Sequence, residues 1–210
     1  MKAMPVTLAP SPSPEMGEGS VVSRYRDFPS TVPACHGWLT LTRRGEWRLG
    51  DARLGAVERV RHAGMRDFIN RHYCFAEDGA WCVENGPQKV YAALEYTPWV
   101  FRLVADQLLA HTGAAAGDPD GAWLDEEGSL LLRTSLGIGV LDDRDLPALL
   151  DQLGDGAGTK LSDEALEALC TGIGPSGGAT LRWGTALLPL EFIAQRDVPT
   201  RFGFNPVPQA

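Results

Sequence analysis

Alternating apolar and polar positions, separated by short turn sequences, predict strands in the middle of the chain. Residues 73–76, 80–84 and 88–94 are strand-like, and Asp78-Gly79 and Asn85-Gly86 separate them. Asp-Gly and Asn-Gly readily adopt the positive φ angles that tight hairpin turns require. The pattern therefore predicts a three-stranded antiparallel meander.

Three further hairpins are expected from the same signals. The first joins residues 38–42 to 47–49 through Arg43-Arg44-Gly45-Glu46. The second joins 122–124 to 130–134 around Glu126-Glu127-Gly128, and residues 138–141 could extend it by one strand. The third joins 180–183 to 187–193, after the glycine-rich turn at 174–178.

Apolar residues at helical spacing predict four helices between these hairpins. The first begins at Asp51 and runs to about residue 69. The second opens at Thr97-Pro98, a capping residue followed by a proline that fits the first helical position, and continues to Leu108. Asp145 and Ser162 are the expected N-caps of the last two helices, and the tail beyond residue 199 is expected to be irregular.

Together these elements predict an α+β fold, in which repeated β-hairpin or meander plus helix units pack around a shared core with mostly antiparallel strands. A Gly-x-Trp sequence recurs at Gly45, Gly79 and Gly121, at unequal spacings of 34 and 42 residues. We expect residues 1–20 to be a flexible tail. Residues 21–112 and 113–210 are expected to form N-terminal and C-terminal β+α units that pack as one compact globule.

Charge distribution narrows the choice of partners. The chain of 210 residues has a net charge of −8, and residues 112–175 hold 13 acidic but only 3 basic groups. This balance argues against nucleic acid, because phosphate binding depends on a surplus of Lys and Arg. The acidic segment 112–175 is interpreted as a solvated face, with a docking surface for a basic partner as the alternative.

The location of the protein is predicted from what its sequence lacks. No apolar run approaches the ~20 residues that cross a bilayer, and the prolines from Pro5 to Pro14 exclude the apolar segment of a signal peptide. Four scattered cysteines are too few for a disulfide framework in a chain of this length. We therefore expect a cytoplasmic protein with reduced thiols and no membrane partner.

Three blocks carry a resemblance to a known family. Gly45-Glu46-Trp47, followed by Leu54 and a helix, resembles the opening of a bacterial domain-of-unknown-function family with repeated β+α units. Gln88-Lys89-Val90 leading to Glu95-Tyr96-Thr97-Pro98-Trp99 is similar to its second block. Leu132-Arg133-Thr134, with Asp142 and Leu146, is similar to its third.

The resemblance covers about residues 40–150. The chain departs from the family at Glu46, where an Asp-Gly usually precedes the Trp, and again in the C-terminal third. The resemblance implies a repeated β+α fold and a binding role in signalling, and it implies no particular catalytic activity.

Metal and catalytic signatures are weak. His72, Cys74 and Cys82 could ligate zinc, since the two cysteines fall on neighbouring strands of the meander, but the paired C-x-x-C clusters typical of zinc sites are missing. Buried, inert thiols are the preferred interpretation, so no metal and no cofactor are expected. The G-x-G-x-x-G at 172–177 follows a helix instead of a strand, and is interpreted as a turn.

A binding surface is predicted around the meander, at Glu84, Asn85, Gln88, Tyr96 and Trp99. The aromatic side chains would supply contact area and the polar ones would orient a ligand; burial of both aromatic rings in the core is the alternative. The function expected is that of a non-enzymatic protein that binds a small ligand or a protein partner, in a regulatory role. A hydrolase or metal-dependent enzyme using scattered His, Cys and carboxylate residues is the alternative, and a homo-oligomer is left open.

Overall fold

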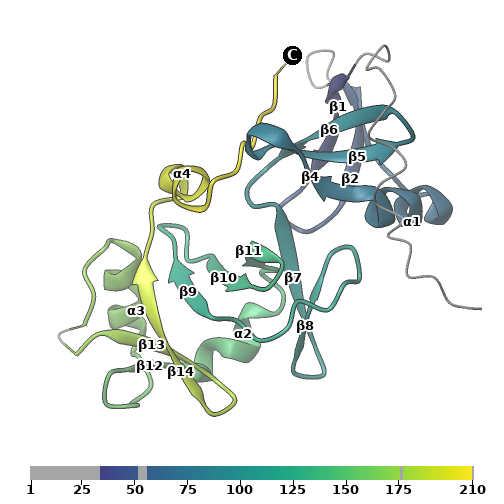
Figure 1. Cartoon of the computed structure of the whole chain (residues 1–210). Coiled ribbons are helices and arrows are strands. Elements are labelled where there is room, and N and C mark those ends of the chain that lie inside the picture. Colours follow the sequence, from purple (N-terminus) through teal and green to yellow (C-terminus); the bar gives the residue numbers. More distant parts are fainter. Residues whose placement is uncertain (1–33, 52–55, 176, 210) are drawn as a thin grey trace, which may run out of the picture.

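The computed structural model describes residues 34–51, 56–175 and 177–209, so the tail predicted at 1–20 lies outside the described residues. The first of its two sheets has the strand order β3-β2-β1-β6-β5-β4, and Figure 1 labels five of these strands, all but β3. Its strands are β1 (Cys35–Leu41), β2 (Trp47–Asp51), β3 (Ala56–Arg59), β4 (Tyr73–Phe75), β5 (Trp81–Asn85) and β6 (Gln88–Leu94).

The second sheet has the order β12-β13-β14-β9-β10-β11-β7-β8. Its strands are β7 (Trp99–Val104), β8 (Gln107–Ala110), β9 (Gly121–Leu124), β10 (Leu130–Thr134), β11 (Gly137–Leu141), β12 (Leu153–Asp155), β13 (Ala179–Trp183) and β14 (Ala186–Phe192). The described helices are α1 (Ala63–His72), α2 (Leu146–Leu149), α3 (Asp163–Cys170) and α4 (Val198–Phe202), with short 3-10 turns at η3 (Glu77–Gly79), η4 (Leu150–Gln152) and η5 (Gln195–Asp197).

One strand arrangement recurs through both sheets. A hairpin or a three-stranded meander is followed by a second meander, whose last strand pairs in parallel with the first strand of the preceding unit. The parallel pairs are β1 with β6, β7 with β11, and β9 with β14, whereas the other strand pairs are antiparallel. The predicted predominance of antiparallel strands is confirmed, but strand residues clearly outnumber helical ones, so the fold is richer in β-structure than a balanced α+β protein.

The predicted meander is confirmed as β4, β5 and β6. Its first turn contains Asp78 and Gly79, both with positive φ, and its second turn contains Gly86 at φ 61°. The hairpins predicted at residues 38–49, 122–134 and 180–193 are also present, as β1–β2, β9–β10 and β13–β14. Ser162 caps α3 as expected, since its side chain accepts a hydrogen bond from the Ala165 backbone N–H at 3.2 Å.

The helix predicted from Thr97 is wrong. Residues 99–110 form the hairpin β7–β8, because Trp99, Val100 and Phe101 enter the second sheet beside β11, where all three are buried. Thr97 does not cap a helix: its hydroxyl donates to the Trp99 carbonyl oxygen at 2.7 Å and accepts from the Val140 backbone N–H. A buried strand loses the polar–apolar alternation, so its pattern resembles that of a helix.

Three other expectations need correction. Of the helix predicted over 51–69, residues 52–55 lie outside the described residues, 56–59 form β3, and the helix begins only at Ala63. Asp145 makes no capping hydrogen bond in α2, because its carboxylate is engaged by Arg102 and by the Leu103 backbone N–H. The tail beyond residue 199 is partly helical, as α4.

A single hydrophobic cluster contains residues of both sheets. Leu39 and Leu41 of the first sheet belong to it, together with Phe101, Leu131 and Leu181 of the second. The C-terminal segment returns to the first sheet (Figure 1), where the Pro206 carbonyl accepts from the Leu94 N–H and the Asn205 N–H donates to the Gly79 carbonyl. The first sheet is therefore held to the rest of the chain through its core and by the C-terminal segment.

The β7–β8 turn is strained in a way that predicts a stabilising change. Ala105 and Asp106 have φ values of 48° and 62° without being glycine. This conformation costs an alanine about 1–2 kcal/mol, whereas an Asn-Gly pair adopts it easily. Replacing Ala105-Asp106 with Asn-Gly should raise the free energy of unfolding by about 1 kcal/mol in urea denaturation. An unchanged or lower value would show that the turn does not have this conformation.

Candidate functional site

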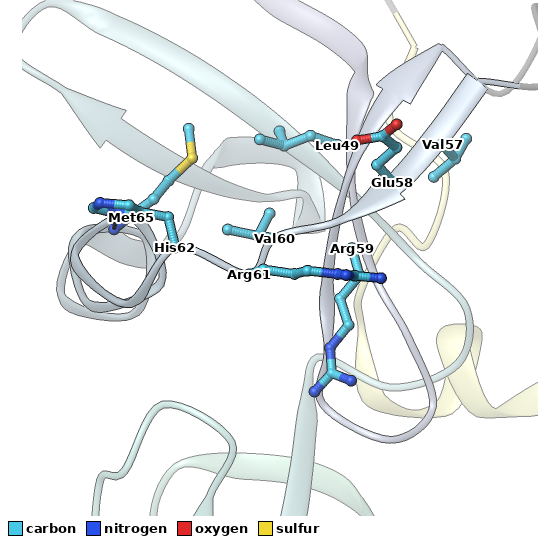
Figure 2. A pocket seen from close by; sticks show the side chains of 8 residues that line it. All are labelled: Leu49, Val57, Glu58, Arg59, Val60, Arg61, His62 and Met65. Atoms are coloured by element: carbon cyan, nitrogen blue, oxygen red, sulfur yellow. Dashed lines mark hydrogen bonds between the residues drawn. The ribbon is translucent and has the colours of Figure 1, made fainter.

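A groove lies between β3 and the start of α1 (Figure 2). Its volume is about 910 Å³, within the range of ligand-binding pockets. Apolar side chains come from three elements: Leu49 from β2, Val57 from β3 and Met65 from α1. Val60 lies between them on the segment that joins β3 to α1. Met65 is 46% exposed, so a large apolar side chain at this groove is left open to solvent.

The groove follows the free edge of the first sheet. Among the described strands, β3 pairs only with β2, in antiparallel register from Asp51–Ala56 to Arg48–Arg59. Every residue from Val57 to His62 lines the groove. An edge strand presents a row of backbone N–H and C=O groups without strand partners, so the groove offers backbone hydrogen bonds beside an apolar surface.

Basic side chains border this groove. Arg59 is held by Glu46, with 3.1 Å between the nitrogen and oxygen. Arg61 is exposed and has no ion-pair partner in the part of the chain that the structure describes. His62 caps α1 by accepting from the Met65 N–H through Nδ1. Glu58 is the acidic side chain among the lining residues, and no ion pair between it and Arg61 is present in the described residues.

A smaller hollow of about 310 Å³ adjoins the groove and shares Arg59 and Val60 with it. It reaches His111, whose ring lies 5.4–5.7 Å from the rings of Trp47, Tyr73 and Trp99. Burial lowers the pKa of His111 to about 3, so the imidazole is neutral at physiological pH. His111 follows β8 and packs within an aromatic cluster.

Two carboxylates of the acidic segment 112–175, which was interpreted as a solvated face, are completely buried. Asp125 accepts hydrogen bonds from the Tyr96 hydroxyl at 2.8 Å and from the backbone N–H groups of Glu127 and Ser129, with an Arg43 nitrogen 3.6 Å away. The Arg43 guanidinium also lies over the Tyr96 ring, at 4.4 Å from its centre. These contacts join the β1–β2 turn of the first sheet to the β9–β10 turn of the second, which indicates a structural role.

Asp142 is the second buried carboxylate. It accepts two hydrogen bonds from the Arg144 side chain and one from its backbone N–H. Burial acts to raise the pKa of Asp142, but the bonds from Arg144 outweigh it and hold the pKa at about 2. Because its oxygens are occupied by Arg144 and approached by Arg102 at 3.9 Å, this carboxylate is also engaged within the fold.

The five residues predicted to bind a ligand do not form one surface. Glu84 and Asn85 are exposed and Gln88 is half-buried, all at the β5–β6 turn. Tyr96 and Trp99 are buried beyond the other end of β6, a strand about 20 Å long. Burial of the aromatic rings, the alternative considered for them, is what the structure describes. Binding at these residues stays a prediction.

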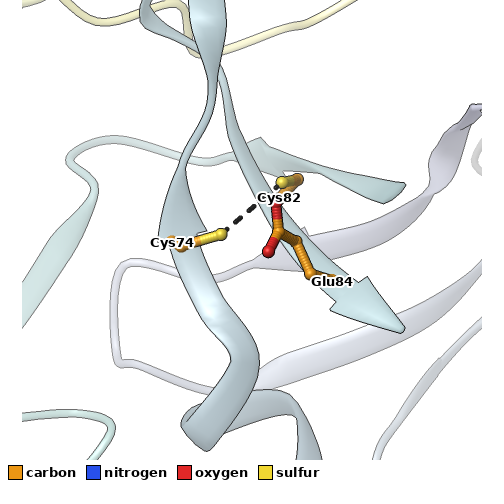
Figure 3. A group of neighbouring side chains, drawn as sticks. All are labelled: Cys74, Cys82 and Glu84. Carbon is orange, nitrogen blue, oxygen red and sulfur yellow. Dashed lines mark hydrogen bonds between the residues drawn. The ribbon is translucent and has the colours of Figure 1, made fainter. Parts of the chain in front are cut away.

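The predicted neighbourhood of Cys74 and Cys82 is confirmed (Figure 3). They are directly opposite on β4 and β5, with their Sγ atoms 3.8 Å apart, and all four cysteines are free. The hydrogen bond between the thiols raises the pKa of Cys82 and lowers that of Cys74. The third side chain near them that could bind a metal is Glu84. His72, the predicted third ligand, packs against Phe68 instead, with 4.4 Å between the two ring centres.

Comparison with protein-family models places the chain in a family without an assigned activity. The model of the family described as "Protein of unknown function (DUF2946)" matches residues 20–209. The chain belongs to this family. The resemblance to a bacterial family of unknown function is therefore confirmed. No curated protein matches the chain.

Two solved structures are similar to part of this chain. A crystal structure of a DUF1285 family protein from Silicibacter pomeroyi DSS-3 matches with a TM-score of 0.48 and 13% identity, over 75% of this chain and 81% of that one. A DUF1285 family protein from Shewanella baltica OS155 matches with a TM-score of 0.38 and 15% identity, over 53% of this chain and 89% of that one. Within the described residues, no helix has the length and apolar character needed to span a bilayer.

Sequence reasoning missed the groove of this family member. Val57, Arg59 and Met65 were assigned to one long helix, which hid the edge strand. The sequence Val57-Glu58-Arg59-Val60 does not alternate, because two polar residues separate the two valines, so no strand pattern marked this edge strand.

Proposed function

We propose that the protein is a non-enzymatic binding protein that takes an extended segment of a partner protein in the groove between β3 and α1. The segment adds a strand to the free edge of β3, places apolar side chains against Leu49, Val57 and Met65, and presents a carboxylate to Arg61. The observation that carries this proposal is the coincidence of an edge strand and a groove that has apolar side chains and is bordered by the start of α1.

Strand addition is a common mode of peptide recognition, in which backbone hydrogen bonds supply affinity and side-chain pockets supply specificity. The groove offers both, because the edge of β3 and the apolar side chains of Val57 and Met65 face the same space. A groove of about 910 Å³, lined by every residue from Val57 to His62, suits an extended chain that runs along the strand direction. Arg61 gives the partner segment its charge preference.

The arrangement of the histidines supports a non-enzymatic role. General-base catalysis on a nucleophile needs a histidine within hydrogen-bond reach of a hydroxyl or thiol, and usually a carboxylate to orient it. Across the described ranges, no histidine side chain bonds to a side chain of that kind: His36 contacts the Pro208 carbonyl oxygen, His62 caps α1, and His111 accepts from the Val100 N–H.

The proposal is tested by selecting from a displayed library of random linear peptides and mapping the best binders by NMR on isotope-labelled protein. We expect selected peptides to carry an acidic residue and alternating apolar residues, and to shift the amide signals of β3 and the first turn of α1. Met65→Glu should weaken their binding at least about tenfold, because a charge would be buried against the apolar side chains. Arg61→Glu should also weaken peptide binding, because it would repel the acidic residue of the peptide.

Matched variants provide the controls. Val104→Glu changes an apolar residue of similar exposure, 49%, and Arg71→Glu reverses a charge at the last turn of α1; neither residue lines the groove. Both should leave binding unchanged. Peptides whose signals map to the β5–β6 turn or to residues 112–175, or a Met65→Glu protein that binds as well as the unaltered one, would exclude the groove as the site.

A further inference from the structure

A second candidate site lies at the opposite edge of the same sheet. In the strand order β3-β2-β1-β6-β5-β4, β4 is the far edge from the groove, and Cys74 is its middle residue. Cys82 on β5 is its direct partner across the sheet, and Glu84 follows two residues later on β5. Because side chains alternate along a strand, Cys82 and Glu84 lie on one face, together with Cys74.

We propose that Cys74, Cys82 and Glu84 form a binding site for a thiophilic divalent metal ion, with Zn²⁺ the ion that best fits this set of ligands. Two thiolates and one carboxylate supply three protein ligands, and a water molecule completes a tetrahedron. The proposal is independent of the groove and of the partner-binding function.

The spacing of the side chains carries this proposal. Two Zn–S bonds of about 2.3 Å at a tetrahedral angle place the sulfur atoms about 3.8 Å apart. The Sγ atoms of Cys74 and Cys82 are 3.8 Å apart, so the sulfurs would not need to move. Two thiols that merely pack together can also lie at this distance. A third ligand favours a metal site over such packing, and a Glu84 carboxylate oxygen lies within 4.8 Å of both sulfurs (Figure 3).

The surroundings suit an ion that enters from solvent. Cys82 is fully buried, Cys74 is half-buried and Glu84 is exposed, so the site has a closed side and an open side. The Glu84 carboxylate is only loosely held, 3.8 Å from the Lys89 nitrogen with both side chains well exposed, and it can swing toward the sulfurs at little cost. Two thiolates and a carboxylate exceed the charge of Zn²⁺ by one, and Lys89 offsets that excess.

Binding exchanges the two thiol protons for the metal ion. The ion takes the place of the protons on the two thiols, which are released to solvent, and the Glu84 carboxylate binds without a proton change at neutral pH. Affinity should therefore rise with pH, as it does for thiolate sites in general. No oxidant or reductant takes part.

The proposal is tested on the full-length protein, stripped with a chelator and kept reduced, by titration with Zn²⁺ against a chromophoric chelator and with Co²⁺ by absorption spectroscopy. We expect one ion per chain, and a Co²⁺ spectrum with the sulfur-to-metal charge-transfer bands and strong visible bands of a tetrahedral thiolate site. Cys74→Ser should abolish the charge-transfer bands or halve them. Glu84→Gln should weaken Zn²⁺ binding by more than about tenfold, since even residues behind the ligands contribute that much.

Cys35→Ser and Cys170→Ser serve as matched controls, because neither sulfur belongs to the cluster. Both should bind the ions as the unaltered protein does. Cys82 is buried, so Cys82→Ser could unfold the chain; Cys74→Ser and Glu84→Gln, at the open side, keep the test decisive. Zn²⁺ binding that survives in Cys74→Ser/Glu84→Gln would overturn the proposal. So would a reduced protein that binds no ion, or one whose Cys74 and Cys82 only form a disulfide in air.

Discussion

Replacing Asp125 with alanine is expected to lower the free energy of unfolding by about 3–5 kcal/mol, because it removes one partner of a buried, hydrogen-bonded charge cluster. Asp125 is fully buried and accepts from the Tyr96 hydroxyl and two backbone N–H groups. Alanine would leave these three donors without an acceptor and Arg43 without a buried counter-charge. The effect is measured by urea denaturation followed by tryptophan fluorescence, with two-state behaviour checked by circular dichroism.

Two variants separate this cluster from ordinary charge effects. Asp125→Asn keeps an oxygen acceptor and the side-chain volume, so it should lose clearly less stability than Asp125→Ala. Asp143→Ala removes a carboxylate that pairs with Arg44 at the surface, where both side chains are about 60% exposed; it should cost less than about 1 kcal/mol. A loss of that small size for Asp125→Ala would mean that Arg43, Tyr96 and Asp125 do not hold the two sheets together.

Elements specified by local sequence could be predicted. Asp78-Gly79 and Asn85-Gly86 determine tight turns within a few residues, and the turn spacing then determines which residues of β4 and β5 face each other. That is why the proximity of Cys74 and Cys82 followed from the sequence. The capping of α3 by Ser162 is equally local.

Features that depend on tertiary position could not be predicted. Trp99, Val100 and Phe101 have the same apolar pattern in a buried strand as in a buried helix, and only their place beside β11 decides between the two. The turn at Ala105-Asp106 lacks the glycine that would have revealed the hairpin. The burial of Asp125 within the acidic segment could not be predicted, because its counter-charge, Arg43, lies 82 residues earlier in the chain.

The candidate sites also depend on tertiary position. The groove exists because β3 ends the first sheet and α1 lies beside it, and strand order is a property of the whole fold. At the proposed metal site the pairing of Cys74 with Cys82 followed from the turn, but the approach of the Glu84 carboxylate to both sulfurs depends on the conformation of an exposed side chain, which the sequence pattern does not determine. The first sheet thus carries one proposed site at each edge: backbone and apolar groups at β3, and thiols at β4.

His111 is expected to make the protein less stable in mild acid. Burial holds the pKa of the folded state at about 3, whereas an unfolded histidine has a pKa of about 6.5. Between these values the unfolded chain binds a proton that the folded chain does not, so stability falls as the pH falls through this window. From about pH 7 to pH 5, His111 alone should lower the free energy of unfolding by about 2 kcal/mol.

The comparison with His111→Phe isolates this contribution, because all other titrating groups are common to both proteins. Phenylalanine keeps a ring against Trp47, Tyr73 and Trp99 but has no proton to bind. It also leaves the Val100 N–H without the Nδ1 acceptor, so His111→Phe should begin less stable at neutral pH. Urea denaturation of both proteins across the pH range should then show the difference narrowing toward pH 5, while His72→Gln, at the exposed end of α1, follows the unaltered protein throughout. Parallel curves for the unaltered protein and His111→Phe would show that the imidazole is accessible to water and takes up a proton in the folded state.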